Sequence, residues 1–364
     1  MGARITALIQ LSLLVSYFSS AQQVVGRISD EETNEPVPFA HVAIGKVVTI
    51  SNEAGEFMIL RESEADSLLQ VSFIGYEPVV LNVSKNPTYN IKLTSSTLSL
   101  SAVTVLTGDI LMQHVFNHLI TNYEMEATRL TSYYKEKLIT QDSLVYLAEG
   151  ILDILSPPNI SGGTTKISPL RTRKVVLQKL DPERATMMSG HAYDMIKSSI
   201  WRENSFLSKA NRKHYSFEYE GKRPYQKHSV YEVSFAPKDN KGYVSGKLFI
   251  EDETYAIIKM IYEPKTNRSN FWDSVKWTEE FEFINGRFNL TAVSYKGAFS
   301  ELGKPYEFYS LLINNSIITS TPASALEQVM DRKDIFVEKA DFDFTEDFWS
   351  GYNFIKLTAE ESSF

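Results

Sequence analysis

The chain of 364 residues contains no cysteine. This absence excludes disulfide bonds, a thiol nucleophile and a zinc site made of thiolates, so the core alone must hold the fold together. A chain of this length can bury enough apolar surface for that purpose, and it is long enough for two or three domains.

Clustered positive charge is also scarce. The 37 Lys and Arg residues are outnumbered by 45 Asp and Glu, which gives a net charge of −8. One short basic run stands out, Arg171-Thr172-Arg173-Lys174, at the head of a strand-like segment. Because nucleic-acid binding draws on several clustered cations, we expect no nucleic-acid partner.

Long apolar runs are missing after the first 21 residues. The segment 1–21 has one positive charge at Arg4, an apolar run over 5–18 and then Ser19-Ser20-Ala21. This order is typical of a secretory signal peptide that is cleaved after Ala21. A membrane anchor is the alternative, but polar residues interrupt a run that is shorter than the ~20 residues of a spanning helix.

Export and the absence of cysteine together predict a protein of the bacterial cell envelope, in the periplasm or associated with the outer membrane. No later segment is apolar enough to suggest a transmembrane helix, so we expect none after cleavage of the signal peptide.

Residues 22–93 alternate short apolar runs with turn clusters, a pattern that predicts a small β-sandwich. Four motifs lie within this segment: Val25-Gly26-Arg27-Ile28, Glu35-Pro36-Val37-Pro38-Phe39-Ala40, Gly55-Glu56-Phe57 and Val71-Ser72-Phe73-Ile74-Gly75-Tyr76. Together they resemble the carboxypeptidase regulatory-like domain, a transthyretin-like module. The resemblance implies a sandwich without catalytic residues that contacts an envelope protein or a glycan.

A polar linker over 94–107 leads out of this domain. In outer-membrane nutrient receptors that carry the module, such a segment continues into a plug and a large β-barrel. The rest of this chain is too short for both, since each barrel strand needs ~10 residues.

The remaining residues, 108–364, are expected to form one helix followed by a curved antiparallel β-sheet, or half-barrel. Apolar residues recur at three- and four-residue spacing over 108–125, which predicts an amphipathic helix capped by Thr107 or Asp109. The pair Asn285-Gly286 is the strongest hairpin signal, and a short helix is expected near 193–200. Alternating patterns predict nine strands, at 131–140, 143–155, 174–180, 228–236, 243–251, 255–263, 275–284, 287–295 and 305–313. The protein as a whole is therefore predicted to be mainly β.

The run 246–257, with the sequence GKLFIEDETYAI, is similar to a recurring hairpin of lipoprotein-carrier-like envelope proteins. That resemblance implies a curved sheet wrapped around a helix, with an apolar concave face.

Three groups of residues could form a catalytic or metal-binding site. His114 and His118 are four residues apart on the predicted helix, but the Glu of a hydrolytic zinc helix is missing. His191 to Asp194 is a weak match to a carboxypeptidase ligand pair without a second ligand cluster. The acidic run 251–253 suits a charged hairpin turn better than a calcium site or an acid–base pair. We therefore expect no catalytic residue, no metal and no cofactor.

An apolar stripe supplies the candidate ligand-binding residues. Trp277, Phe281 and Phe283 alternate on one strand, and Phe288 and Leu290 alternate on the partner strand across the predicted turn. Such stripes usually form the core side of a sheet. The functional alternative is an open apolar groove for a lipid, an acyl chain or a partner peptide.

These observations favour a non-catalytic binding or scaffolding protein of the bacterial envelope, whose partner is an envelope protein, a glycan or an apolar ligand. Two alternatives stay open. One is a periplasmic carrier of lipid or lipoprotein, and the other is a hydrolase of unrecognised type.

Overall fold

The structure is a computed structural model. It describes residues 22–363 apart from residues 46, 62, 64, 84–87, 97–105, 160–162, 179–190, 227, 267–270, 320–325, 327, 342–346, 351–354 and 360. The predicted signal peptide, residues 1–21, and most of the predicted linker lie outside the described residues.

Two small sheets form the first part of the fold, which we call the sandwich. One sheet has the strand order β4-β1-β7, and the other has the order β3-β2-β5-β6. The strand β1 pairs antiparallel with β4 and parallel with β7. The strands are β1 (Gln22–Asp30), β2 (His41–Ile44), β3 (Val47–Ile50), β4 (Glu56–Arg61), β5 (Leu68–Ser72), β6 (Val79–Asn82) and β7 (Thr88–Leu93).

Alternation buries one side of these strands, as β5 illustrates. Leu69 and Val71 belong to the sandwich core, whereas Gln70 between them is exposed. The turn before β4 depends on Gly55, which has a φ of +73°. A Cβ at this position would lie 2.3 Å from the carbonyl oxygen of Ile28, so glycine is required for both its conformation and its size.

The helix α1 (Gly108–Asn122) follows the sandwich. Its first turn is capped by Thr107, whose Oγ1 accepts a hydrogen bond of 3.3 Å from the amide of Ile110. Leu111 and Val115 are buried against the large sheet. A Cβ on Gly108 would lie 2.2 Å from the carbonyl oxygen of Phe217, so this glycine allows the helix to start directly on a strand.

Ten antiparallel strands form the large sheet, in the order β10-β9-β8-β17-β16-β15-β14-β13-β12-β11. In sequence, β8 is the first and β17 the last strand of this sheet, and the two pair as the third and fourth strands of its order. The strands are β8 (Thr128–Thr140), β9 (Ser143–Ser156), β10 (Lys166–Val176), β11 (Tyr215–Tyr225), β12 (His228–Pro237), β13 (Val244–Glu251), β14 (Ile257–Pro264), β15 (Ser274–Ile284), β16 (Arg287–Glu301) and β17 (Lys304–Thr319).

The structure confirms the predicted mainly β class, the helix and the curved antiparallel sheet. It also confirms the predicted two-residue hairpin turn at Asn285-Gly286. Asn285 and Gly286 both have positive φ, 54° and 85°, and Ile284 pairs with Arg287 across them. Two strand predictions were wrong. β11 was missed, and β10 lies at 166–176 rather than at 174–180.

Both errors concern the edge strands of the sheet. Pro169 lies within β10, where the register shifts, and Gly221 marks a register shift in β11. Proline and bulges are tolerated at an edge because the outward amides need no partner strand. The sequence pattern of a regular strand is therefore weakest at these two places.

The described helices other than α1 are short. They are α3 (His191–Asp194), α4 (Phe336–Lys339), α5 (Asp347–Ser350), η1 (Ser199–Trp201), η2 (Arg212–His214) and η4 (Glu361–Ser363). The helix expected near 193–200 is thus two separate turns, α3 and η1. None of the described helices has the length and apolar character that crossing a membrane requires.

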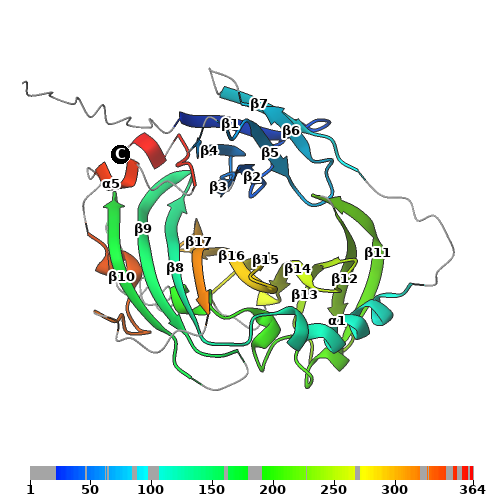
Figure 1. The fold of residues 1–364 in the computed structure, drawn as a ribbon. Coiled ribbons are helices and arrows are strands. Elements are labelled where there is room, and N and C mark those ends of the chain that lie inside the picture. Colours follow the sequence, from blue (N-terminus) through cyan, green and yellow to red (C-terminus); the bar gives the residue numbers. More distant parts are fainter. Residues whose placement is uncertain are drawn as a thin grey trace, which may run out of the picture.

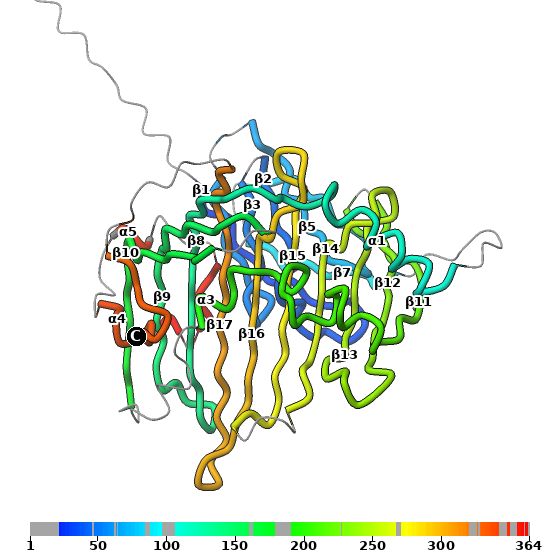
Figure 2. Tube along the Cα trace, turned by 90° about the horizontal axis from the view of Figure 1, so that it is seen from below, coloured from blue at the N-terminus to red at the C-terminus, as the bar shows by residue number. Residues whose placement is uncertain are grey.

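The large sheet is an open curve with the sandwich over its concave side (Figure 1). The opposite side carries α1 and the segment that contains α3 (Figure 2). We call the side toward the sandwich the inner face, with Lys135 and Glu280 among its residues. We call the side toward α1 the outer face, with Leu138 and Phe281 among its residues.

Candidate functional site

Four of the five predicted ligand-binding residues belong to the packed outer face. Phe281 and Phe288 are buried in the cluster that α1 covers, and Trp277 and Leu290 pack against it. The ring of Tyr123, just after α1, lies 5.4 Å from that of Phe281 and 6.1 Å from that of Phe288. The structure thus brings these residues together, but it fills the space above them with protein.

A small cavity remains beside Phe281, Phe288 and Leu290. Its volume is about 50 Å³, which is room for one or two water molecules rather than an acyl chain. Phe283 lies apart from it, with 64% of its surface exposed at the end of β15. The apolar stripe therefore forms part of the core in this structure.

A buried carboxylate fixes the segment that covers this stripe. Glu279 accepts hydrogen bonds from the hydroxyl of Ser198 at 2.5 Å and from the amide of Ser199 at 3.0 Å. The hydroxyl of Tyr262 donates to the same carboxylate at 2.8 Å. Glu279 and both serines are buried, so this cluster joins the 191–201 segment to the sheet and does not border open solvent.

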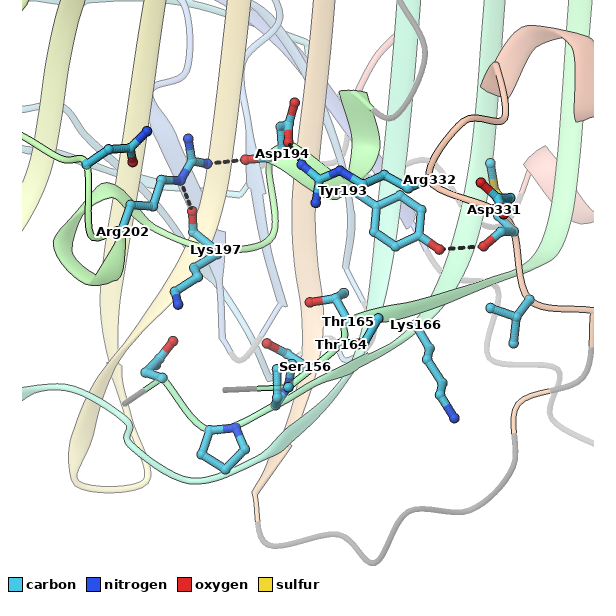
Figure 3. Close-up of a pocket in the computed structure, with 17 residues that line it drawn as sticks. Ser156, Thr164, Thr165, Lys166, Tyr193, Asp194, Lys197, Arg202, Asp331 and Arg332 are labelled. Carbon is cyan, nitrogen blue, oxygen red and sulfur yellow. Dashed lines mark hydrogen bonds and ion pairs between the residues drawn. The ribbon is translucent and has the colours of Figure 1, made fainter. Parts of the chain in front are cut away.

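A large cavity with a polar lining lies at the edge of that segment (Figure 3). Its volume is about 870 Å³, within the usual range for sites that bind small molecules. Three parts of the chain line it: residues 156–159 with 163–166, several residues of 193–204, and residues 329–332. The hydroxyl of Tyr193 donates to the carbonyl oxygen of Met330 at 2.5 Å and so ties two of these stretches together. We call this space the polar cavity.

Cations outnumber anions around the polar cavity. Its lining contains Lys166, Lys197, Arg202 and Arg332, against Asp194 and Asp331. Asp194 forms an ion pair with Arg332. Within the described part of the chain, neither lysine ammonium has an ion-pair partner, and the two side chains extend from different sides of the cavity (Figure 3). A local excess of positive charge in a chain of net charge −8 favours an anionic ligand here.

Arg202 connects the polar cavity to the aromatic core. Its Nε donates to the carbonyl oxygen of Lys197 at 2.8 Å, and its guanidinium lies 5.6 Å from the ring centroid of Trp277. Below it, the His191 ring packs 4.4 Å from the ring of Tyr295. Burial lowers the pKa of His191 to about 3, with a smaller contribution from Arg202, so this imidazole is neutral at physiological pH.

The inner face carries buried ion pairs that connect the sandwich to the sheet. His41 of β2 contacts the carboxylates of Glu280 at 3.1 Å and Glu282 at 3.3 Å. Glu280 also contacts the ammonium of Lys259 at 2.7 Å, and Lys137 contacts Glu53 of the sandwich at 2.8 Å. The two domains are thus joined by pairs of opposite charge.

These contacts outweigh the effect of burial on ionisation. Burial alone disfavours charge on Glu280, but Lys259 and His41 lower the pKa of this carboxyl to about 2. Burial likewise opposes the charge of His41, yet Glu280 and Glu282 raise its pKa to about 9. Both groups are therefore charged at neutral pH.

The resemblance to lipoprotein-carrier-like proteins implied an apolar concave face, and the structure shows a face that is partly apolar and partly charged. The concave inner face carries the ion pairs of Lys135, Lys137, Lys259 and Glu280 beside a smaller apolar cluster that includes Tyr133 and Leu311, whereas the two larger apolar clusters lie on the opposite face. Lys135, Glu136 and Lys137 are consecutive charged residues of β8, so the sequence pattern did not indicate which face carries charge.

The basic run 171–174 is used within the fold. Arg173 pairs with Glu149 at 2.5 Å, and the ammonium of Lys174 donates to the carbonyl oxygen of Val337 at 2.8 Å. Thr172 donates to Asp341 at 3.0 Å.

The residues weighed for metal binding have other contacts. His114 and His118 stack on Tyr255, with ring centroids 4.5 and 6.0 Å away. The ligand atoms of His228, Glu251 and Glu253 lie within 4.8 Å of one another, the one such group among the described residues. Glu251, however, accepts hydrogen bonds from the amide and the hydroxyl of Thr254 at 2.8 and 2.5 Å, as in a charged hairpin turn.

Comparison with known proteins identifies the first part of the chain. Residues 24–105 match the family model of the CarboxypepD_reg-like domain. The resemblance predicted from the four sequence motifs is thereby confirmed, and the match extends beyond the last strand of the sandwich. None of the curated proteins compared with the chain matches it.

Three solved structures align with more than half of the chain. A DUF1329 family protein from Desulfovibrio piger has 12% identity and a TM-score of 0.30, over 60% of this chain and 95% of that chain. The MucA/MucB complex of Pseudomonas aeruginosa has 8% identity and a TM-score of 0.19, over 58% and 100%. A structure of lipid–protein interactions in lipovitellin has 9% identity and a TM-score of 0.25, over 56% and 27%. Likeness at this level carries no conclusion about function.

Proposed function

We propose that this protein is a non-catalytic binding protein of the bacterial envelope, and that its ligand is a polar molecule with an anionic group, bound in the polar cavity. The observation that carries the proposal is the contrast between the two spaces around the predicted site. The polar cavity measures about 870 Å³, and the cavity beside Phe281 and Phe288 about 50 Å³. Of these two spaces, only the first has room for a ligand of more than a few atoms.

The lining of the polar cavity supports an anionic ligand. The ammonium groups of Lys166 and Lys197 offer charge that the described residues do not neutralise, and the hydroxyls of Thr164 and Thr165 add hydrogen-bonding groups. A carboxylate or a phosphate group satisfies lysine ammonium groups at such a site.

The absence of catalysis is part of the proposal, and the roles of the buried carboxylates support it. Glu279 holds Ser198, Ser199 and Tyr262 within the core. Glu136 accepts hydrogen bonds from the hydroxyl of Tyr134 at 2.7 Å and from the amide of Val337 at 3.1 Å. Both groups join segments of the chain, whereas a general acid or base must reach a substrate.

The location in the envelope rests on the signal-peptide pattern of residues 1–21 and on the CarboxypepD_reg-like domain. Expression of the full chain with osmotic-shock fractionation tests this location.

Isothermal titration calorimetry tests the ligand, with inorganic phosphate, D-glucuronate and neutral D-glucose as probes. We expect the two anions to bind and glucose to bind at least about tenfold more weakly, because the charge contributes more than ~1.4 kcal/mol. The double variant Lys166→Met/Lys197→Met should lose this difference. The control Lys276→Met removes an exposed charge on β15 and should retain it.

Failure of both anions to bind, or equal binding by the double variant, would contradict the assignment of the polar cavity. Hydrolysis of a chromogenic ester or peptide that Glu279→Gln abolishes would instead establish the hydrolase alternative. Lipid found by native mass spectrometry on the purified protein would favour the carrier alternative.

A further inference from the structure

Residues 355–359 and 361–363, which we call the segment 355–363, lie between the sandwich and the inner face of the large sheet. On the sandwich side, Asn52 donates from Nδ2 to the carbonyl oxygen of Lys356 at 3.0 Å, and the ammonium of Lys356 lies 3.3 Å from Glu56. On the sheet side, Ile355 is buried in a cluster with Tyr133. The segment therefore contacts both domains at their junction.

The segment 355–363 contacts the two domains in the way that a bound peptide would. In the described part of the chain, residues 355–363 pair with no strand of either domain, and their one regular element is the single turn η4 (Glu361–Ser363). The turn is closed locally, since the amide of Ser362 donates to the carbonyl oxygen of Thr358 at 2.9 Å. Side chains and one backbone carbonyl, rather than a ladder of hydrogen bonds, hold the segment in place.

The principal contact is a carboxylate between two lysines. Glu361 Oε2 lies 2.6 Å from the ammonium of Lys135, and Oε1 lies 2.8 Å from the ammonium of Lys137. The relative exposures of these three side chains are 2%, 1% and 9%. Burial alone opposes ionisation of Glu361, but Lys135 and Lys137 lower the pKa of its carboxyl to about 2.

This pair of lysines requires an anion. Lys137 also contacts Glu53, but Glu361 is the one ion-pair partner of Lys135 among the described residues. Removal of Glu361 would leave the buried ammonium of Lys135 unpaired and that of Lys137 with one partner fewer, which is energetically costly. Any occupant of this place must therefore carry a carboxylate, together with an apolar side chain where Ile355 lies.

We propose that this junction is a peptide-binding site for carboxylate-bearing segments, and that residues 355–363 are its resident, exchangeable occupant. The site consists of Asn52, Glu53 and Glu56 of the sandwich and of Tyr133, Lys135 and Lys137 of β8. It is separate from the polar cavity, and the proposal does not depend on the function assigned to that cavity.

Exchange of the segment tests this proposal in the full chain. A protease site inserted after Ser350 allows the segment to be cut from the folded protein, and a fluorescent peptide of residues 351–364 is then added. We expect the labelled peptide to enter the cut protein, with a rise in anisotropy, and not the uncut protein. An unlabelled peptide with Glu361→Gln should compete at least about tenfold more weakly than the unaltered peptide, because it leaves the buried lysines unpaired.

Two protein variants localise the binding. Lys135→Met/Lys137→Met should lose the preference for the unaltered peptide over the Glu361→Gln peptide. Lys276→Met, which removes one exposed charge from β15, should keep it. Circular dichroism of the cut protein before and after gel filtration reports whether it stays folded.

Three results with the cut protein would overturn the proposal. Failure of the labelled peptide to enter, or unfolding of the cut protein, would make the segment a fixed part of the fold. Equal competition by the two peptides would show that the site does not select for a carboxylate. A dimer of the uncut protein that excess peptide converts to monomer would assign the occupant to a second copy of the chain and contradict occupancy by the same chain.

Discussion

The inner and outer faces of the ten-stranded sheet are both covered by other parts of the chain, and the chemistry of the two coverings differs. The outer face packs against α1 and the 191–201 segment through aromatic and aliphatic side chains. The inner face meets the sandwich and the segment 355–363 mainly through the ion pairs of His41, Lys135 and Lys137, beside a smaller apolar cluster with Ile50 and Ile355. One sheet thus combines an apolar core with an ionic junction.

The difference shows what each face contributes. Apolar burial is the larger source of stability, but it is not directional. A buried ion pair contributes little net stability, yet breaking it is costly, so it specifies which atoms must meet. The outer face is therefore expected to dominate the free energy of unfolding, and the inner face to determine how the sandwich is positioned.

The largest effect should come from the outer face. Phe308 of β17 is fully buried, and Phe308→Ala should lower the free energy of unfolding by about 4 kcal/mol through lost burial and a cavity. Urea denaturation measures this change. The control Phe283→Ala removes the same ring from an exposed position and should change the free energy by less than about 0.5 kcal/mol. Equal losses in the two variants would contradict the division between core and surface.

A carboxylate on the outer face should give the next largest effect, and it depends on pH. Burial raises the pKa of Glu136 to about 7, despite hydrogen bonds from Tyr134 and Val337. A raised carboxyl pKa stabilises the fold below the unfolded value of 4.5, and that contribution is lost as pH rises through about 7. Between pH 4.5 and 8 the wild type should lose about 3 kcal/mol relative to Glu136→Gln.

Urea denaturation at several pH values measures this loss. Glu307→Gln, on an exposed carboxylate of β17, serves as the control and should follow the wild type. A constant difference between Glu136→Gln and the wild type at all pH values would show that Glu136 does not titrate in this window.

The smallest effect should come from the inner face, with a different pH dependence. The pKa of His41 is raised to about 9 by Glu280 and Glu282, so its contribution is complete below pH 6.5 and is lost as pH rises through about 9. His41→Gln should therefore cost roughly 2 kcal/mol at pH 6 and nearly nothing at pH 9.5. The exposed His228 provides the control His228→Gln, which should change stability by less than about 0.5 kcal/mol at either pH.

Patterns of local sequence predicted the fold class well, because strand alternation, the cap at Thr107 and the turn at Asn285-Gly286 each depend on a few neighbouring residues. The same patterns could not show whether the apolar side of a strand is open to solvent or covered by other parts of the chain. Trp277 and Phe281 were correctly placed on one side of β15, but whether that side is open depends on α1 and on the 191–201 segment, which are distant in sequence.

The ionic junction was beyond prediction for a related reason. Lys135 and Lys137 look like ordinary exposed positions of an alternating strand until Glu361 and Glu53 are placed against them. These partners come from the two ends of the described chain. The polar cavity was equally hidden, because its lysines and arginines come from three separate stretches.

The pairing of β8 with β17 has a consequence for how the molecule forms. Since this contact joins strands from opposite ends of the domain in sequence, loop-closure entropy must be overcome before the sheet is complete. Folding of such a topology, rich in distant contacts, is expected to be slow. During synthesis the small N-terminal module has all its strands long before the larger domain does, and it is therefore the first part of the chain able to reach its native form.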